Sequence, residues 1–188
     1  PRTSGIPGSR EFSASLTRLG LPAPTPGTVE LLVDGPEFFP ALEEELRNAR
    51  ESIDLQLYIW DNDDISVHYA DLVKKHGRSV PTRILLDDIG TTVSASLEPH
   101  TPAPAGFRAV PDMARYLRRD SSLQLRRILN PWAVLDHCKL LVFDGRTAFL
   151  GGINIGREYY SEWHDLMVRV RGPVVDQLQP EFDKKWRF

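Results

Sequence analysis

The chain has 188 residues, and 41% of them are hydrophobic, so it is long enough to form one domain with a buried core. Its net charge of −3 argues against a protein that simply coats nucleic acid, but not against a nuclease with a local basic surface. A single cysteine, Cys138, excludes an internal disulfide framework. No apolar run approaches the roughly 18 residues that span a bilayer, although a chain that begins at Pro1 rather than Met leaves a removed signal or anchor open.

The first 27 residues are expected to form a loose arm, because Gly, Pro, Ser and Thr dominate them and they show little periodicity. Residues 28–188 are expected to form one domain. Its first half alternates short runs of strand-forming residues with segments whose apolar residues recur at helical spacing. This alternation predicts an α/β fold, with helices around a mixed, mostly parallel sheet. The expected strands cover 28–34, 52–60 and 81–88, and the expected helices cover 37–50 and 65–76.

Acidic residues follow two of these strands. The run DNDD at 61–64 is compatible with a metal site, but no His or Cys accompanies it at ligand spacing, so helix capping and solvation are preferred. Asp87 and Asp88 end a strand, where α/β folds place their sites, yet a structural role is preferred for this pair. We expect no metal and no other cofactor.

The second half of the chain begins with a Pro-, Ser- and Thr-rich loop at 91–110. Six arginines between Arg108 and Arg127 crowd the next segment, either as solvated faces of ordinary elements or as a rim that faces an anionic substrate. The remaining expected elements are a helix at 111–120, strands at 123–129 and 163–172, a helical turn at 155–160 and a last helix at 173–186.

The stretch from His137 to Asn154, HCKLLVFDGRTAFLGGIN, carries the chemistry of the chain. Two apolar runs flank the Asp-Gly turn signal at 144–145, which predicts a β-hairpin. His137 and Lys139 are two positions apart, so within a strand they project from the same face. Cys138 between them would then point to the opposite side, into the core.

These groups together suit a phosphodiester. The His137 imidazole can attack phosphorus, while the Lys139 ammonium and the Asn154 amide can hold the non-bridging oxygens, where charge gathers in the transition state. Gly151 and Gly152 allow a backbone to come close to a ligand. The alternative, a His and a Lys on the wet face of an ordinary hairpin, explains most isolated H-x-K pairs but not the whole pattern.

The pattern H-x-K-x4-D-x6-G-[GS]-x-N is filled at every fixed position here, and it resembles the HKD motif of the phospholipase D superfamily. The segments LLVDGPEFFPALEEELRNARESIDLQLYIWDND, RILLDDIG and WHDLMVRVRGPVV resemble the amino-terminal half of bacterial cardiolipin synthase-like proteins. The resemblance covers roughly residues 28 to 188 and is weakest between about 91 and 130. It implies a phospholipase D-like α/β/α sandwich that carries one HKD motif.

The resemblance also implies roles for individual residues. His137 would be the nucleophile that forms a covalent phosphohistidine. Lys139 and Asn154 would bind the phosphate, with Gly152 as a backbone contact. Asp165, at the start of a strand, would accept a hydrogen bond from the ring of His137 and fix its tautomer. On sequence alone, a plain carboxylate at a strand start explains Asp165 equally well.

Asp144 belongs to the same motif. The Asp-Gly turn places it at the far end of the hairpin from His137. We therefore expect Asp144 to brace local backbone through hydrogen bonds, and not to take part in the reaction.

Cleavage of a phosphodiester also needs a general acid for the leaving group. In the resembled family that acid is the His of a second H-x-K motif, which this chain lacks. Its histidines without a Lys two positions later are His68, His76, His100 and His164. A complete site therefore needs a second HKD half, either in a homodimer with an isologous interface or in another part of a longer or separate polypeptide. The similarity to an amino-terminal half favours the second arrangement.

Three functions remain open. The leading hypothesis is a phospholipase D-type phosphatidyltransferase or phospholipase, which passes a phosphatidyl group from a phospholipid through His137 to an alcohol or to water, at a membrane surface to which it binds peripherally. The second is a nuclease on DNA or RNA, because the same chemistry serves any phosphodiester. The third is a non-catalytic half that only binds phosphate groups or a partner. The compartment stays undetermined, and the resemblance favours the bacterial cytoplasm or the membrane surface.

Overall fold

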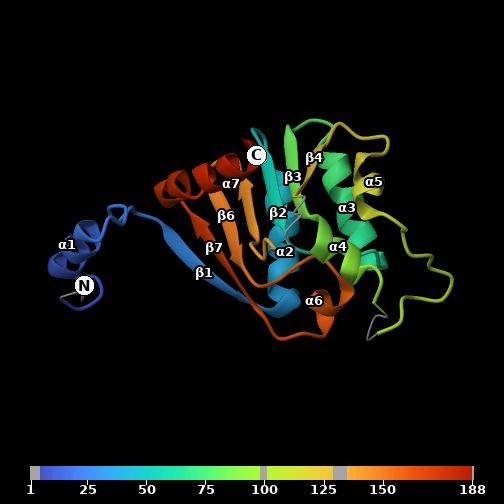
Figure 1. Ribbon diagram of the computed structural model, residues 1–188, viewed down its shortest axis with the longest axis horizontal. Coiled ribbons are helices and arrows are strands. Elements are labelled where there is room, and N and C mark those ends of the chain that lie inside the picture. The colour runs from blue at the N-terminus through green and yellow to red at the C-terminus, as the bar shows by residue number, and fades with distance from the viewer. Residues whose placement is uncertain (1–4, 98–100, 129–134, 188) are drawn as a thin grey trace.

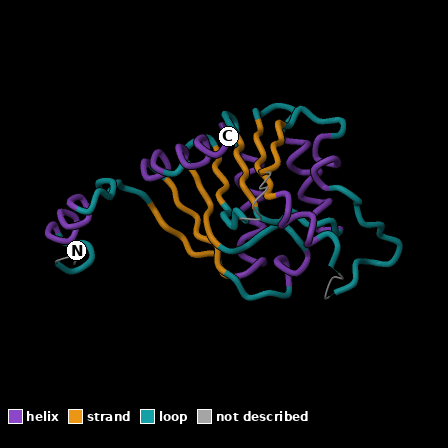
Figure 2. The backbone as a smooth tube through the Cα atoms, viewed as in Figure 1, coloured by secondary structure: helices purple, strands orange, loops and turns teal. Residues whose placement is uncertain are grey.

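A seven-stranded sheet forms the centre of the computed structural model, which describes residues 5–97, 101–128 and 135–187 (Figures 1 and 2). The strands lie in the order β1-β7-β6-β5-β2-β3-β4. They are β1 (Thr28–Val33), β2 (Ile53–Leu57), β3 (Thr82–Asp87), β4 (Gln124–Ile128), β5 (Leu140–Phe143), β6 (Thr147–Gly151) and β7 (Leu166–Arg171). The helices are α1 (Arg10–Arg18), α2 (Asp34–Asn48), α3 (Asp64–His76), α4 (Asp88–Ser94), α5 (Met113–Arg118), α6 (Arg157–Ser161), α7 (Gln179–Arg187) and the 3-10 helix η1 (Pro173–Gln177).

The α/β fold is confirmed, but the expectation of a mostly parallel sheet is wrong. Among the described strands, only β2, β3 and β4 run parallel to one another, and all other neighbours pair antiparallel. Strand–helix–strand alternation produces parallel neighbours through crossover connections, and here it holds only from β2 to β4. The β5–β6 hairpin and the β7 strand beside it need no crossover, so they run antiparallel.

Helices cover both faces of the sheet, as in an α/β/α sandwich. In Figure 1, α2 lies behind the sheet and α7 lies in front of it. The larger core cluster, on the side of α2, α3 and α5, includes the fully buried Phe39 and Leu141 of β5. The smaller cluster, on the side of η1 and α7, includes Val142 of β5 and Phe182 of α7. Successive residues of β5 therefore point to opposite cores, as the pleat of a strand requires.

The amino-terminal arm contains a helix, α1, that was not predicted. The Ser9 hydroxyl caps it by accepting a hydrogen bond from the Phe12 N–H at 3.1 Å. In Figure 1, α1 stands away from the sheet, and the arm reaches the domain at β1. There the Val174 N–H donates to the Pro26 carbonyl at 3.1 Å. The domain boundary at residue 28 stays a prediction.

Other elements differ from expectation in their ends. α3 begins after Asp63, whose carboxylate accepts from the Ser66 N–H at 2.7 Å, so the capping interpretation of the DNDD run is confirmed. The loop expected at 91–110 starts inside α4. The last expected helix is split into η1 and α7, because Pro180 lacks the N–H that a continuous helix would direct to the Asp176 carbonyl.

Candidate active site

His137 and Lys139 meet in the structure, but just before the hairpin rather than within it, because β5 begins at Leu140. The Lys139 ammonium lies 3.0 Å from Nδ1 of His137 and donates a hydrogen bond to the His137 carbonyl, also at 3.0 Å. Lys139 is buried, whereas His137 is exposed. This arrangement leaves the imidazole open to a ligand and places a cation against its ring.

Cys138 points away from this pair, as predicted. Its side chain is half-buried and packs against the smaller core cluster under α7. Burial raises the pKa of its thiol, while the charges of Lys185 and Lys139 act in the opposite direction. Since a thiol rather than a thiolate is a poor nucleophile, Cys138 acts as a packing residue.

Tyr58 completes the group and was not predicted from the sequence. Its ring centroid lies 4.2 Å from that of His137 and 5.0 Å from the Lys139 ammonium. Tyr58 follows β2 directly, and the antiparallel pairing of β2 with β5 brings the end of one strand beside the start of the other. The strand-forming run that contains Tyr58 was visible in the sequence, but its pairing with the motif hairpin was not.

Burial lowers the pKa of Lys139, and the charges of Asp165, Cys138 and Asp136 oppose this shift. The ammonium is thus held in a site that is poorly hydrated. Because the interaction between opposite charges strengthens as the effective dielectric falls, a phosphate that reaches Lys139 would be bound more strongly than by a lysine in open water.

Gly152 lies against Asp165. A Cβ at this position would come 2.0 Å from one carboxylate oxygen of Asp165 and 2.6 Å from its Cγ. The Gly152 N–H donates to the Leu166 carbonyl at 2.9 Å. The contact of Gly152 with a phosphate stays a prediction. The fold itself requires a glycine here, because the Asp165 side chain occupies the space of a Cβ.

Asp165 is held by Asp34 on the other side. The Asp165 N–H donates to the Asp34 carboxylate at 2.7 Å, and the Asp34 N–H donates to the Asp165 carbonyl at 2.9 Å. The Asp165 carboxylate accepts from the Leu166 N–H at 2.7 Å. Within the described part of the chain, Asp165 makes no hydrogen bond to His137, and its charge acts on Lys139 instead. The role of Asp165 as the acceptor for His137 stays a prediction.

Asn154 is buried and connects the segment after the hairpin to the end of β2. Its side-chain oxygen accepts a hydrogen bond from the Ile59 N–H at 3.0 Å. Burial raises the pKa of Tyr159, and a hydrogen bond to Asn154 opposes that shift. Through Ile59, Asn154 fixes the backbone next to Tyr58 and so supports the contact of the Tyr58 ring with His137. Its role in binding phosphate stays a prediction.

Asp144 braces backbone, as predicted, but the braced residues are distant in sequence. Its carboxylate accepts hydrogen bonds from the N–H groups of Arg50, Glu51 and Ser52 at 3.0, 2.7 and 2.9 Å. Burial works against ionisation, but these three donors hold the pKa of Asp144 below its usual range. The turn of the hairpin is thereby anchored to the residues that precede β2.

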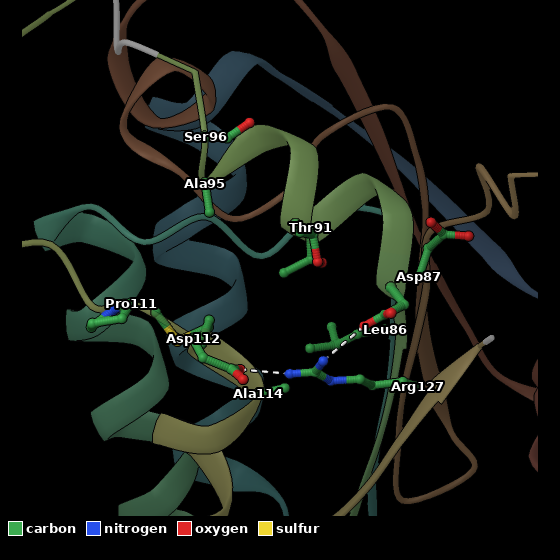
Figure 3. Close-up of a pocket in the computed structure, with 12 residues that line it drawn as sticks. Leu86, Asp87, Thr91, Ala95, Ser96, Pro111, Asp112, Ala114 and Arg127 are labelled. Carbon is green, nitrogen blue, oxygen red and sulfur yellow. Dashed lines mark hydrogen bonds and ion pairs between the residues drawn. The ribbon is translucent and has the colours of Figure 1, made fainter. Parts of the chain in front are cut away.

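A cavity of about 340 Å³ lies between α4 and α5 (Figure 3). Arg127 reaches across it and forms ion pairs with Asp88 at 2.9 Å and with Asp112 at 2.6 Å. The Arg127 guanidinium is thus already paired with two carboxylates. Arg127 is one of the six arginines noted in the sequence before the motif. Neither His137 nor Lys139 lines this cavity, so we assign it no part in phosphate chemistry.

A second cavity, of about 530 Å³, includes Tyr58 in its lining, but neither His137 nor Lys139 lines it. Most of its wall is apolar, with Val93 and Phe107 among the lining side chains. Three carboxylates, of Asp61, Asp63 and Glu158, also line it, so we assign it no part in phosphate chemistry either.

Within residues 5–97, 101–128 and 135–187, no three His, Cys, Asp or Glu side chains gather as ligands of a metal ion. In the same residues, no helix combines the length and the apolar character needed to cross a membrane.

Comparison with known proteins identifies the family. The model of the family described as "Cardiolipin synthase, PLD-like domain" matches residues 42–186. The chain belongs to this phospholipase D-like family. The resemblance found in the HKD motif is thus confirmed over most of the chain.

Named relatives of this phospholipase D-like chain are longer proteins. Cardiolipin synthase B of Salmonella typhi is 34% identical over 164 residues, which cover 82% of this chain and 38% of that protein. Cardiolipin synthase A of Pseudomonas fluorescens is 31% identical over 188 residues, which cover 92% of this chain and 36% of that protein. The chain therefore spans little more than a third of the length of these relatives.

The fold of the phospholipase D-like chain also matches a solved structure. Nuc from Salmonella typhimurium, a phospholipase D family member, superposes with a TM-score of 0.66 at 16% identity, over 86% of this chain and 95% of Nuc. One unit of this size is therefore sufficient to build the fold.

Proposed function

We propose that this chain is one HKD half of a phospholipase D-type enzyme that moves a phosphatidyl group from a phospholipid, through His137, to an alcohol or to water. The observation that carries the proposal is the 3.0 Å contact between the imidazole of His137 and the buried ammonium of Lys139, with His137 open to a ligand. The cardiolipin synthases among the relatives favour a phospholipid over a nucleic acid as the substrate.

In the first step, a ring nitrogen of His137 attacks phosphorus, the P–N bond forms and the P–O bond to the leaving alcohol breaks. An ammonium is only a donor, so Nδ1 of His137 accepts from Lys139 and the ring proton sits on the other nitrogen. A phosphate that draws Lys139 to its oxygens releases Nδ1. The ring can then take the opposite tautomer, with the proton on Nδ1 and Nε2 as the nucleophile. An acceptor would hold the Nδ1 proton, and Asp165 is the candidate.

In the second step, the hydroxyl of an alcohol or of water attacks the phosphohistidine. The new P–O bond forms, the P–N bond breaks, and His137 is restored. A His in a second HKD half is proposed to handle both proton transfers. It gives a proton to the first leaving group and takes the proton that the acceptor hydroxyl loses.

The second half is proposed to lie in another part of a longer or separate polypeptide, because the chain matches only 36% and 38% of two cardiolipin synthases. A homodimer is the alternative, in which His137 of each copy serves the other across a twofold axis. Light scattering of the purified chain at several concentrations distinguishes them, since a stable dimer favours the homodimer and a monomer favours the separate half.

A phosphodiester with a p-nitrophenolate leaving group tests the nucleophile without the second half, because this leaving group departs at neutral pH without protonation. We expect one equivalent of p-nitrophenolate per chain, and a matching increase in protein mass located on His137. His137→Asn should lose this burst. His68→Asn, which changes an exposed histidine of α3, should keep it.

A burst that survives in His137→Asn, or a wild-type chain without any burst, would contradict the proposal. Once a complete site has been assembled, phosphatidylglycerol vesicles and short DNA or RNA strands are compared as substrates. Turnover of the nucleic acid with a steep loss at higher salt would favour the nuclease alternative.

A further inference from the structure

Asp136, the residue before the candidate nucleophile, is held by three parts of the fold. Its carboxylate forms an ion pair with the Lys185 ammonium of α7, at 2.7 and 2.9 Å. It also accepts a hydrogen bond from the Gln56 amide of β2 at 3.0 Å. Its backbone N–H donates to the Asp87 carboxylate at the end of β3, at 2.9 Å. Asp136 is thus fixed relative to the sheet and to the helix in front of it.

The Asp136 carboxylate also bonds to the main chain on the far side of His137. One oxygen of Asp136 accepts a hydrogen bond from the Cys138 N–H at 3.2 Å, so residues 136–138 form an Asx turn with His137 at its centre. On the other side, the Lys139 ammonium holds the His137 carbonyl at 3.0 Å. The main chain of His137 is therefore restrained before and after its Cα, which limits the positions that the ring can take.

Gln56 shows that Asp136 determines the side chains around it. Gln56 is buried, and its carbonyl oxygen has no hydrogen-bond partner in the described part of the chain. Reversing the amide would place that oxygen against the Asp136 carboxylate and would remove a donor from it. The orientation with an unsatisfied oxygen is thus the one that supplies a hydrogen bond to Asp136.

Lys185 comes from a helix that is firmly attached to the sheet. Phe182 of α7 is fully buried in the smaller core cluster. Arg83 of β3 forms ion pairs with Asp183 of α7 at 2.8 Å and with Asp54 of β2 at 2.6 Å. Figure 1 shows α7 in front of the sheet, on the face opposite α2. An attachment of this kind gives Lys185 a defined position from which to hold Asp136.

We infer that Lys185 and Asp136 are positioning residues: the ion pair from α7 holds the Asx turn that sets the imidazole of His137 for attack on phosphorus. This inference rests on the proposed function for its chemistry and on the contacts above for its geometry. Neither residue touches the substrate. An error of about 1 Å in the placement of a reacting group can cost on the order of 100-fold in rate, so a modest shift of this turn has a measurable effect.

The test compares three variants of α7 in the complete chain. Lys185→Met removes the charge and keeps the length of the side chain, and Lys185→Arg keeps the charge. Lys184→Met makes the same change at the neighbouring lysine, which is exposed and makes no ion pair among the described residues. The readouts are the burst rate with the p-nitrophenyl phosphodiester, the binding of inorganic phosphate, and the imidazole resonances of His137 in NMR spectra.

We expect Lys185→Met to lower the burst rate roughly 10- to 100-fold and to shift the His137 resonances. Phosphate binding should change by less than about threefold, because Lys139 and Asn154 are untouched. The melting temperature should change little, since a partly exposed ion pair contributes little to stability. Lys185→Arg should restore most of the rate, and Lys184→Met should behave as wild type.

A merely structural ion pair predicts the reverse, a lower melting temperature with an unchanged rate and unchanged His137 resonances, and that result would overturn the inference. An equal loss in Lys184→Met would also overturn it. If the wild-type chain shows no burst, the proposed function fails, but the NMR comparison still tests the positioning. Unchanged His137 resonances in Lys185→Met alongside a normal wild-type burst would reject only the positioning.

Discussion

Gly152→Ala tests the close packing of Gly152, at the end of the hairpin, against the Asp165 side chain before β7. The new Cβ would lie 2.0 Å from an oxygen of Asp165 and 2.6 Å from its Cγ, so the carboxylate must withdraw by more than about 1 Å to reach ordinary contact. Withdrawal breaks the 2.7 Å hydrogen bond from the Leu166 N–H, and bonds to charged groups contribute about 1.5–3 kcal/mol. With the strain of overpacking, about 1–3 kcal/mol, the free energy of unfolding should fall by roughly 2.5–6 kcal/mol.

Urea denaturation of four proteins checks this prediction: wild type, Gly152→Ala, Asp165→Ala and the double variant. Because Asp165→Ala removes the atoms that the new Cβ would meet, Gly152→Ala should cost at least about 1 kcal/mol less in that background. Gly156→Ala is a matched control, since its Cβ would come no closer than 3.2 Å to a neighbour. An equal cost in both backgrounds would refute the packing argument. Unchanged stability with weaker phosphate binding would instead support the contact predicted from the sequence.

Three further predictions concern the motif hairpin and the candidate site. Asp144→Asn keeps a residue that tolerates the φ of 54° but weakens three hydrogen bonds, so it should lower the free energy of unfolding by about 1–3 kcal/mol at pH 7. The pKa of Asp144 is depressed in the folded state, so this contribution is present above about pH 4 and is lost as the pH falls through the folded pKa. The denaturation curves of wild type and Asp144→Asn should therefore converge in acid. A difference in stability that stays constant with pH would refute this prediction. Tyr58→Ala should slow the burst about 10-fold by removing the ring beside His137, whereas the burst rate of Tyr58→Phe should stay within about threefold of wild type. Equal losses in the two variants would show that the hydroxyl, and not the ring, is responsible. Burial lowers the pKa of Lys139, so its charge opposes folding below the pH at which an exposed lysine titrates. The melting temperature of Lys139→Met should therefore be no lower than that of wild type, while phosphate binding is lost. A much lower melting temperature would show that the ammonium stabilises the fold.

Local patterns in the sequence predicted much of the fold and the chemistry. The β-hairpin followed from two apolar runs around an Asp-Gly turn, and the structure has β5 and β6 there. α3 followed from helical spacing after a capping aspartate, Asp63. The pairing of His137 with Lys139 followed from their separation by one residue, although the pair lies just before β5. Each of these features depends on residues close together in the chain, so a short window of sequence contains the signal.

Features that depend on contacts between distant segments were not predicted. The direction of β7, β6 and β5 against β2 depends on which strands become neighbours, and no periodicity encodes that choice. The close approach of Gly152 to the Asp165 side chain, which comes just before β7, is one such contact, while its predicted contact with a phosphate stays a prediction. A glycine shows that space is needed, and the sequence does not say what fills it. The helix α1 was missed for a different reason, because a short segment rich in Ser, Gly and Pro resembles a loop even where a Ser9 cap starts a helix.

The surroundings of residues 136–139 come from four distant parts of the chain. Tyr58 after β2 lies beside His137, Asp87 at the end of β3 and Lys185 on α7 hold Asp136, and the charge of Asp165 before β7 acts on Lys139. The segments directly before and after the motif hairpin carry the groups that would react with or bind a phosphate, and the rest of the fold supplies their orientation. Substitutions should therefore divide into two kinds. Loss of a group that binds the anion should weaken phosphate binding and slow the reaction together, whereas loss of a group that orients the ring should slow the reaction and leave binding nearly unchanged. That division follows only if the imidazole acts as a nucleophile with a required geometry, because a site that merely binds phosphate would not depend on the direction of the ring.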